Sequence, residues 1–238
     1  ADFRPPEFDP GYPFLVLGRG SLGGKGRGLA FVFRQLSRWL HDERIHGIRM
    51  RLPRTLVIGA NESDTFLKEN AISLTSFDHS PDDEILRRFA NGRLNSRLRE
   101  CLEFYVRHVN VPLAVRSSGL LEDSQRQPLA GLYATYMLPN NHPDPDVRLR
   151  QLETAVKLVY ASGYLERPRR YLEAIGHDLA ESRMAVLVQE VAGRRYGRYF
   201  YPAISGVAQS HNYYPVFQMK PEDGVATIAL GLGKQVVE

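Results

Sequence analysis

Apolar residues recur at helical spacing through much of the first two thirds of the chain. After a glycine-rich turn, Leu29, Val32, Phe33, Leu36 and Leu40 are separated by polar residues, and this spacing predicts an amphipathic helix. Similar patterns and start signals predict further helices over residues 62–70, from 82 onward, and over 95–106, 147–160 and 168–174.

Short apolar runs, typical of strands, dominate the last third. Residues 183–191 (RMAVLVQEV) form a run of the kind found in buried strands. After a predicted turn over 193–197, strand candidates follow at 199–204, 206–209, 214–219 and 225–230, separated by glycine, proline and asparagine. Earlier strands are predicted at 15–17 and 52–58. Helices early and antiparallel strands late, without regular βαβ alternation, favour the α+β class.

The stretch from Pro112 to Asn140 has a distinctive order of polar and apolar residues. An apolar run stops on Arg116-Ser117-Ser118-Gly119, an acidic loop follows, and the chain returns through Gly131 into a second apolar run. This order predicts a strand, a charged loop and a returning strand. An arginine and two hydroxyl groups at the end of a strand suit an anionic ligand.

The segment Gly18–Gly28 places a glycine-rich turn between a predicted strand and a predicted helix. Glycines allow backbone N–H groups to approach phosphate oxygens, and a helix N-terminus supplies unpaired donors. Lys25 and Arg27 lie in the first helical turn, where cations oppose the helix dipole, so a bound anion would relieve the conflict. The segment has no Gly-Lys-Ser/Thr and is therefore not a Walker A loop, and glycine-rich turns are common.

Composition narrows the possible classes of protein. A chain of 238 residues can form one large domain or two small lobes. It has no apolar run near the roughly 20 residues that span a bilayer, and its first residues lack the basic-then-apolar layout of a signal peptide. One cysteine fits a reducing compartment, so we expect a cytoplasmic protein. The net charge of +4 is spread along the chain, unlike the basic stripe of a nucleic-acid-binding protein; we expect neither a membrane nor a nucleic acid as a partner.

Several motifs together resemble a known family. The sequence AVRSS, followed by an acidic pair and by Ala-Gly and a threonine on the returning run, is similar to the nucleotide-binding domain of pyruvate phosphate dikinase and phosphoenolpyruvate synthase. The other matching segments are Gly23-Gly24-Lys25, Leu52-Pro53, 185–189, 205–208 and 231–233. The resemblance implies an ATP-grasp-like α+β fold in which two lobes, with antiparallel sheets and flanking helices, clamp ATP.

We therefore expect one nucleotide-binding module over residues 1–238. Its approximate lobes are 1–110 with a helix-and-strand insert at 111–180, and a mostly stranded 181–238. The chain lacks a starting methionine and stops within an apolar stretch, so we expect it to be a piece of a longer protein.

The resemblance also implies roles for particular residues. Lys25 and Arg116 match the family's lysine and arginine that meet the ATP phosphates, and are the candidate catalytic residues. Gly131 and Thr135 match positions on the returning strand whose backbone and hydroxyl reach the nucleotide. Taken alone, Lys25 could equally be a solvated lysine at a helix end.

Three consecutive residues match the family's adenine site. Gln189 is similar to the glutamine at the end of the strand behind the base, and Glu190 and Val191 would form the hinge beside it. The alternative for Gln189 is an ordinary amide at a strand end. Glu122 and Asp123 match the family's acidic pair, which would orient Arg116, lie near the metal, or simply be solvated.

One position departs from the family pattern. A glutamate that helps to hold Mg²⁺ is replaced here by Lys234, and a protonated lysine cannot bind a hard cation. Three interpretations remain open: the Lys234 ammonium replaces part of the metal's charge, the metal uses Glu238 or later residues, or catalysis is weakened.

The expected cofactors are accordingly ATP and Mg²⁺, with the metal's ligands left open by Lys234. In the family, this domain passes a phosphoryl group from ATP to a carrier histidine on a separate domain. The chain has no Gly-Gly-x-x-Ser-His motif, so we expect it to need the phosphohistidine carrier domain of its parent protein. The alternative is a regulatory nucleotide-binding module with degraded catalysis.

Overall fold

The computed structural model of the chain describes residues 12–36, 50–77, 80–119, 131–179 and 183–233. The chain divides into two compact units, Ala1–Val191 and Ala192–Glu238.

The first unit is built on a five-stranded sheet with the order β1-β2-β5-β3-β4. Its strands are β1 (Phe14–Leu17), β2 (Thr55–Ile58), β3 (Leu113–Gly119), β4 (Thr135–Leu138) and β5 (Met184–Glu190). All neighbouring pairs are antiparallel except β1 and β2. The α+β prediction is confirmed, with one parallel pair that the expectation of antiparallel sheets did not include. This pair is parallel because the chain crosses over between the two strands through α1 (Gly23–Leu36).

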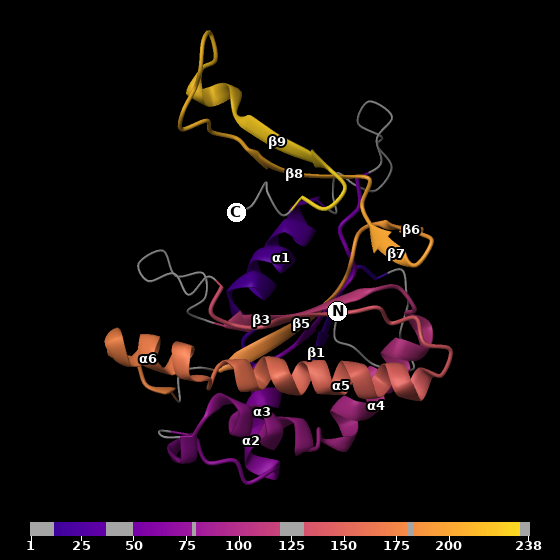
Figure 1. Cartoon of the computed structure of the whole chain (residues 1–238), viewed down its shortest axis with the longest axis vertical. Helices are drawn as coiled ribbons and strands as arrows, with labels where there is room; N and C mark the ends of the chain where they lie inside the picture. The colour runs from indigo at the N-terminus through magenta and orange to yellow at the C-terminus, as the bar shows by residue number, and fades with distance from the viewer. Residues whose placement is uncertain (1–11, 37–49, 78–79, 120–130, 180–182, 234–238) are drawn as a thin grey trace. The chain divides into compact units, whose positions relative to one another are not determined.

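The two faces of this sheet are covered differently. Helix α1 packs on one face against β3 and β5, whereas α5 packs on the other against β3, β4 and β5; Figure 1 shows these two helices on opposite sides of the strands. Helix α5 spans Pro145–Ser162. The other helices on its side of the sheet are α2 (Asn61–Glu69), α3 (Asp82–Asn91), α4 (Ser96–His108) and α6 (Glu166–Ala174). Most of the buried apolar residues lie on this side.

Aromatic side chains fill the centre of the large core. Phe66, Phe77, Phe89, Tyr160 and Tyr164 contact one another with ring centroids 5.5–5.9 Å apart. Such tilted and offset pairs add to the free energy gained from burial. The small core on the α1 side contains Val57, Ala60, Ala185 and Leu187. The large core therefore supports the sheet on the α5 side, and the α1 side is only partly covered.

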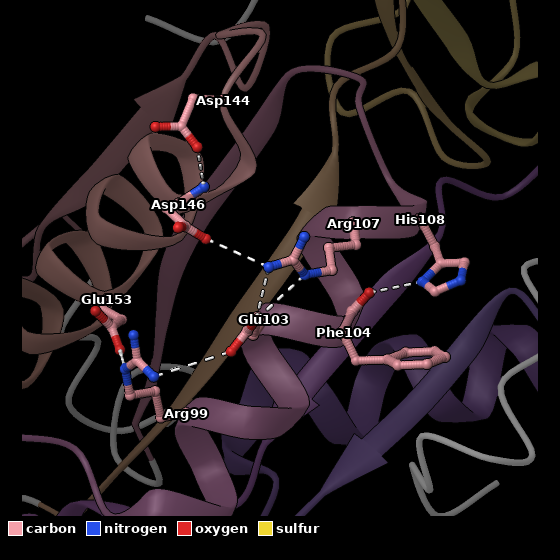
Figure 2. Close-up of polar contacts among 8 residues, drawn as sticks. All are labelled: Arg99, Glu103, Phe104, Arg107, His108, Asp144, Asp146 and Glu153. Atoms are coloured by element: carbon pink, nitrogen blue, oxygen red, sulfur yellow. Dashed lines mark hydrogen bonds and ion pairs between the residues drawn. The ribbon is translucent and has the colours of Figure 1, made fainter.

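Ion pairs join α4 to α5 at the surface (Figure 2). Arg107 contacts Glu103 of its own helix at 2.8 Å and Asp146 of α5 at 3.4 Å, and Arg99 contacts Glu153 of α5 at 3.1 Å. Exposed pairs of this kind contribute little to stability individually. Their cross-helix geometry nevertheless favours one position of α4 relative to α5, the helix that packs against β3 and β4.

The Arg116-Ser117-Ser118-Gly119 segment lies at the end of a strand, as predicted. Strand β3 ends at Gly119 and pairs with β5 along its whole length, from Leu113 opposite Glu190 to Gly119 opposite Met184. The long apolar run of β5 provides backbone partners for Ser117 and Ser118, and this pairing overrides their local preference for turns. The antiparallel return through β4 is confirmed.

The second unit contains two small antiparallel ribbons. One pairs β6 (Arg194–Tyr196) with β7 (Tyr199–Tyr201), and the other pairs β8 (Ile204–Gln209) with β9 (Val225–Leu230). The strand predicted at 225–230 is confirmed. The turn predicted over 193–197 is wrong, because three of its residues form β6. The strand predicted at 214–219 is also wrong, since Phe217 has φ +55° and interrupts an extended backbone.

Candidate functional site

Three of the predicted site residues share one face of the sheet. Arg116 on β3 lies opposite Thr135 on β4, and Gln189 on β5 lies opposite Ala114, two residues before Arg116. Side chains alternate along a strand and directly opposed residues point the same way. Arg116, Thr135 and Gln189 therefore face the side on which α1 packs. Arg116 is half-buried and Thr135 is exposed.

The glycine-rich turn is attached to the end of β3 by Ser118. The Ser118 hydroxyl donates to the Leu22 carbonyl oxygen at 2.8 Å and accepts from the Gly26 N–H at 3.0 Å. A Cβ at Gly23 would lie only 1.8 Å from the Ser118 carbonyl oxygen, and Gly23 has φ +68°. Glycine at this position thus permits both a left-handed backbone and close contact between the turn and β3.

The other side of the turn is attached to the start of α2. The N–H groups of Gly59 and Asn61 donate to the carbonyl oxygens of Leu17 and Arg19 at 2.8 and 3.1 Å, and the Ala60 N–H donates to Ser21 at 2.9 Å. These bonds extend the contact between β1 and β2 beyond the strands. The turn is therefore fixed on both sides within the first unit.

Lys25 lies in the first turn of α1, as predicted, between the attached residues Gly23 and Gly26. Its side chain is half-buried, and this turn contains no acidic residue. A lysine here adds positive charge to the positive end of the helix dipole. With Arg116 on the adjoining sheet face, the two cations create an environment that favours a polyanion.

The side chain of Gln189 is held by a neighbouring strand. Its Nε2 donates to Thr55 Oγ1 at 3.1 Å, and Thr55 Oγ1 in turn donates to the Pro53 carbonyl oxygen at 3.1 Å. This contact fits the alternative that Gln189 is an ordinary amide at a strand end. It also fixes the orientation of the amide on the α1 side of the sheet.

Glu190 points to the opposite face from Gln189, as alternation along β5 requires. Its carboxylate forms an ion pair with Arg54 at 2.6 Å, and the two side chains are 15% and 30% exposed. Burial, followed by the charge of Glu190, raises the pKa of Tyr105. The structure therefore does not bring the Glu190 carboxylate together with Arg116. The backbone N–H groups of Glu190 and Val191 donate to Arg54 and Pro112 oxygens, both at 2.9 Å.

The remaining predicted positions are less constrained or lie outside the described residues. Gly131 is exposed, has φ +75°, and a Cβ there would meet no atom within 4 Å. Its backbone conformation explains the glycine, whereas steric contact does not. Glu122, Asp123, Lys234 and Glu238 lie outside the described residues.

We identify no cluster of metal-ligating side chains within the part of the chain that the structure describes. Within it, no group of three or more histidine, cysteine, aspartate or glutamate side chains is placed to hold a metal ion. The side chains predicted to meet phosphate are cations, which cannot bind Mg²⁺ directly. Also within the described ranges, every helix is too short or too polar to cross a bilayer.

Two hollows in the first unit lie away from these residues. One, of about 880 Å³, is lined by α6 and the start of α3, and the other, of about 370 Å³, by α5 and the helix-facing side of β4. Neither includes a predicted site residue. Within this unit, the candidate site lies on the sheet face that carries α1, beside the N-terminus of that helix.

Two residues that hold the site together were not singled out from the sequence. Ser118 was noted only as a hydroxyl near an anion, and its contact with a turn more than ninety residues earlier has no local signal. Asn140 is buried with φ +48°, and its Nδ2 donates to the Val109 and Val111 carbonyl oxygens at 2.8 and 2.9 Å. It holds the segment that leads into β3. A loop asparagine after a strand was its one detectable sign.

Comparison with known proteins adds an independent finding. Residues 19–238 match the family model of the pyruvate phosphate dikinase AMP/ATP-binding domain. A search of curated proteins gave no match. The family match covers the glycine-rich turn, β3, β4 and β5, which together carry the site described above.

Proposed function

Because the chain belongs to the family of pyruvate phosphate dikinase AMP/ATP-binding domains, we propose that it binds ATP through Lys25 and Arg116 and donates a phosphoryl group to a carrier histidine. The histidine would lie on another domain of the parent protein. The chain is then one component of a phosphotransferase and needs that domain to complete a reaction cycle. The final acceptor of the phosphoryl group is a property of the parent protein.

One observation supports this assignment above the others. Arg116, Thr135 and Gln189 come from three different strands, yet their register directs all three to the face that carries α1 and Lys25. A structural role for each residue separately does not require this convergence. A triphosphate and an attached base would require it, because their binding groups must lie on one surface.

The individual roles follow from side-chain chemistry. Arg116 presents a planar guanidinium with donors in a fixed geometry, which suits phosphate oxygens. Lys25 contributes a compact charge at the helix N-terminus, where backbone N–H groups also point toward an anion. The Thr135 hydroxyl and the Gly131 backbone would contact the nucleotide nearby. Gln189 would lie behind the base, with the backbone of Glu190 and Val191 beside it.

Catalysis in this proposal depends on alignment and charge. Phosphoryl transfer requires little covalent chemistry from the protein, so most of the acceleration comes from positioning and electrostatic stabilisation. Bound Mg²⁺ would supply charge neutralisation at the phosphate oxygens. The residues of this chain that hold the phosphates are Lys25 and Arg116, and we assign no Mg²⁺ ligand among the described residues.

Isothermal titration of the chain with ATP tests the proposal. We expect affinity in the micromolar range, and a loss of about tenfold or more, or roughly 1.4 kcal/mol, in both Arg116→Ala and Lys25→Ala. Matched controls are Arg87→Ala and Lys68→Ala, which remove the same charges from exposed positions on α3 and α2. Unchanged affinity in both site variants, with wild-type affinity intact, would contradict the assignment of the site.

A second function is favoured by one sequence observation. Lys234 replaces the glutamate of the family pattern that helps to hold Mg²⁺, which would suit a regulatory module that binds nucleotide without efficient transfer. Phosphohistidine formation in the parent protein distinguishes the two functions. ATP binding without phosphohistidine, together with a gain of turnover in Lys234→Glu, would support the regulatory function.

A further inference from the structure

The Ser118 hydroxyl is a buried group that joins two distant parts of the candidate site. It is 0% exposed and lies on β3, two residues after Arg116 and on the same face. It donates to the Leu22 carbonyl oxygen and accepts from the Gly26 N–H. Leu22 and Gly26 enclose the start of α1, where Lys25 lies.

This geometry adds a contact from β3 to the local cap of the helix. The first N–H groups of a helix have no partner within it, and a side chain just before the helix commonly accepts from one of them. In α1, Ser21 Oγ supplies this local cap by accepting from the Gly23 N–H at 3.1 Å, and the Gly26 N–H, at the fourth residue of the helix, donates to Ser118 of β3. The position of the first turn of α1 therefore depends on β3.

We propose that Ser118 is a positioning residue that fixes the phosphate-binding turn relative to Arg116. This inference rests on the proposed function, because it concerns how Lys25 and Arg116 are held at a common ligand. Ser118 does not contact the nucleotide itself. Its hydroxyl sets the distance between the first turn of α1 and β3, so that Lys25 and Arg116 contact the same group of phosphates.

Loss of the Ser118 hydroxyl should weaken the binding of the phosphates and not that of the nucleoside. Removing the hydroxyl leaves the buried Gly26 N–H and the Leu22 carbonyl oxygen without this partner, which is costly, so the turn should move or become mobile. The sheet residues Gln189 and Thr135 belong to other strands and keep their register. Affinity for the triphosphate should therefore fall while affinity for the nucleoside remains.

The test compares Ser118→Ala with Ser117→Ala in the full chain. Ser117 is also buried, at 2% exposure, but alternation along β3 directs it to the face of the sheet that α5 covers. We expect Ser118→Ala to weaken ATP binding about tenfold, with adenosine affinity unchanged. We expect Ser117→Ala to leave both affinities unchanged. A general loss of structure would instead lower both affinities in proportion.

A readout independent of nucleotide separates failure of this inference from failure of the proposed function. Hydrogen exchange of the Gly26 amide, followed by NMR, should accelerate by about tenfold or more in Ser118→Ala and not in Ser117→Ala. If the wild-type chain binds no ATP, the proposed function is wrong and the phosphate role of Ser118 with it. Exchange of Gly26 then decides whether the link itself exists.

Two further outcomes are decisive. Unchanged ATP affinity in a folded Ser118→Ala chain would overturn the positioning role, and unchanged Gly26 exchange would overturn the link. If Ser118→Ala does not fold, Ser118→Cys keeps a similar side-chain size with a weaker donor and acceptor. That variant should fold and show the same preferential loss of ATP over adenosine, and equal losses for both ligands would overturn the inference.

Discussion

Replacing Gly23 with alanine adds a single methyl group, but we expect it to displace the glycine-rich turn from β3. Gly23 opens α1 with φ +68°, and a Cβ there would lie 1.8 Å from the Ser118 carbonyl oxygen. A carbon and an oxygen that are not bonded approach to about 3.3 Å. The turn must therefore move by about 1.5 Å, because the opposing atom belongs to the backbone of a strand that is paired with β5 at this position.

The free-energy cost has two physical sources. A left-handed backbone at a residue with a Cβ costs about 1–2 kcal/mol. The displacement should also break the two hydrogen bonds of the Ser118 hydroxyl, each of which contributes about 0.5–1.5 kcal/mol. We therefore expect Gly23→Ala to lower the free energy of unfolding of the first unit by about 2–5 kcal/mol. ATP affinity should fall by about tenfold or more at temperatures where the chain remains folded.

Gly28→Ala provides a matched control in the same helix. Gly28 is exposed, and a Cβ there would meet no atom within 4 Å. Alanine in a helix interior is favoured over glycine by about 0.5–1 kcal/mol, so this variant should be slightly more stable than the wild type. Urea unfolding followed by circular dichroism measures both variants, and isothermal titration measures their ATP affinities. Wild-type stability in Gly23→Ala would refute the close contact between the turn and β3.

Two further changes test the support of β3 and the state of the cysteine. Asn140→Ala should lower the free energy of unfolding by about 2–4 kcal/mol, because it removes both hydrogen bonds to the 109–111 segment and puts alanine at a positive φ that asparagine tolerates better. Asn140→Gly should recover the backbone part of this loss, and equal losses in urea unfolding would contradict this division. Cys101 should react slowly with a disulfide reagent at neutral pH, because burial raises the pKa of its thiol and the thiolate is the reactive form. Reaction in the native chain as fast as in urea would show that the thiol is accessible.

Much of the fold could be anticipated from local patterns. Helical spacing located α3, α4, α5 and α6 to within a few residues, and the apolar run at 183–191 located β5. These elements are long and strongly periodic, which is where pattern is most informative. The family motifs likewise predict Lys25 and Arg116 as site residues.

The errors arose in the last third of the chain, where local preference and backbone pairing disagree. Residues 194–196, within the predicted turn over 193–197, form β6 and pair with β7. Phe217 has a left-handed backbone within an apparently strand-like segment. In both places, contacts beyond the local segment or an unusual backbone conformation outweigh the propensity of the residues.

The stretch 112–140 shows which features local sequence can predict and which it cannot. Its residues alone indicated two strands, an arginine suited to anions and a glycine on the returning chain. They could not indicate that β5 lies between β2 and β3, that Gln189 therefore shares a face with Arg116 whereas Glu190 does not, or that Ser118 contacts the glycine-rich turn. Spacing along the chain encodes which face of its own element a residue occupies. Which elements become neighbours, and in which register, is set by the packing of the whole core, since backbone pairing between distant strands has no local signature.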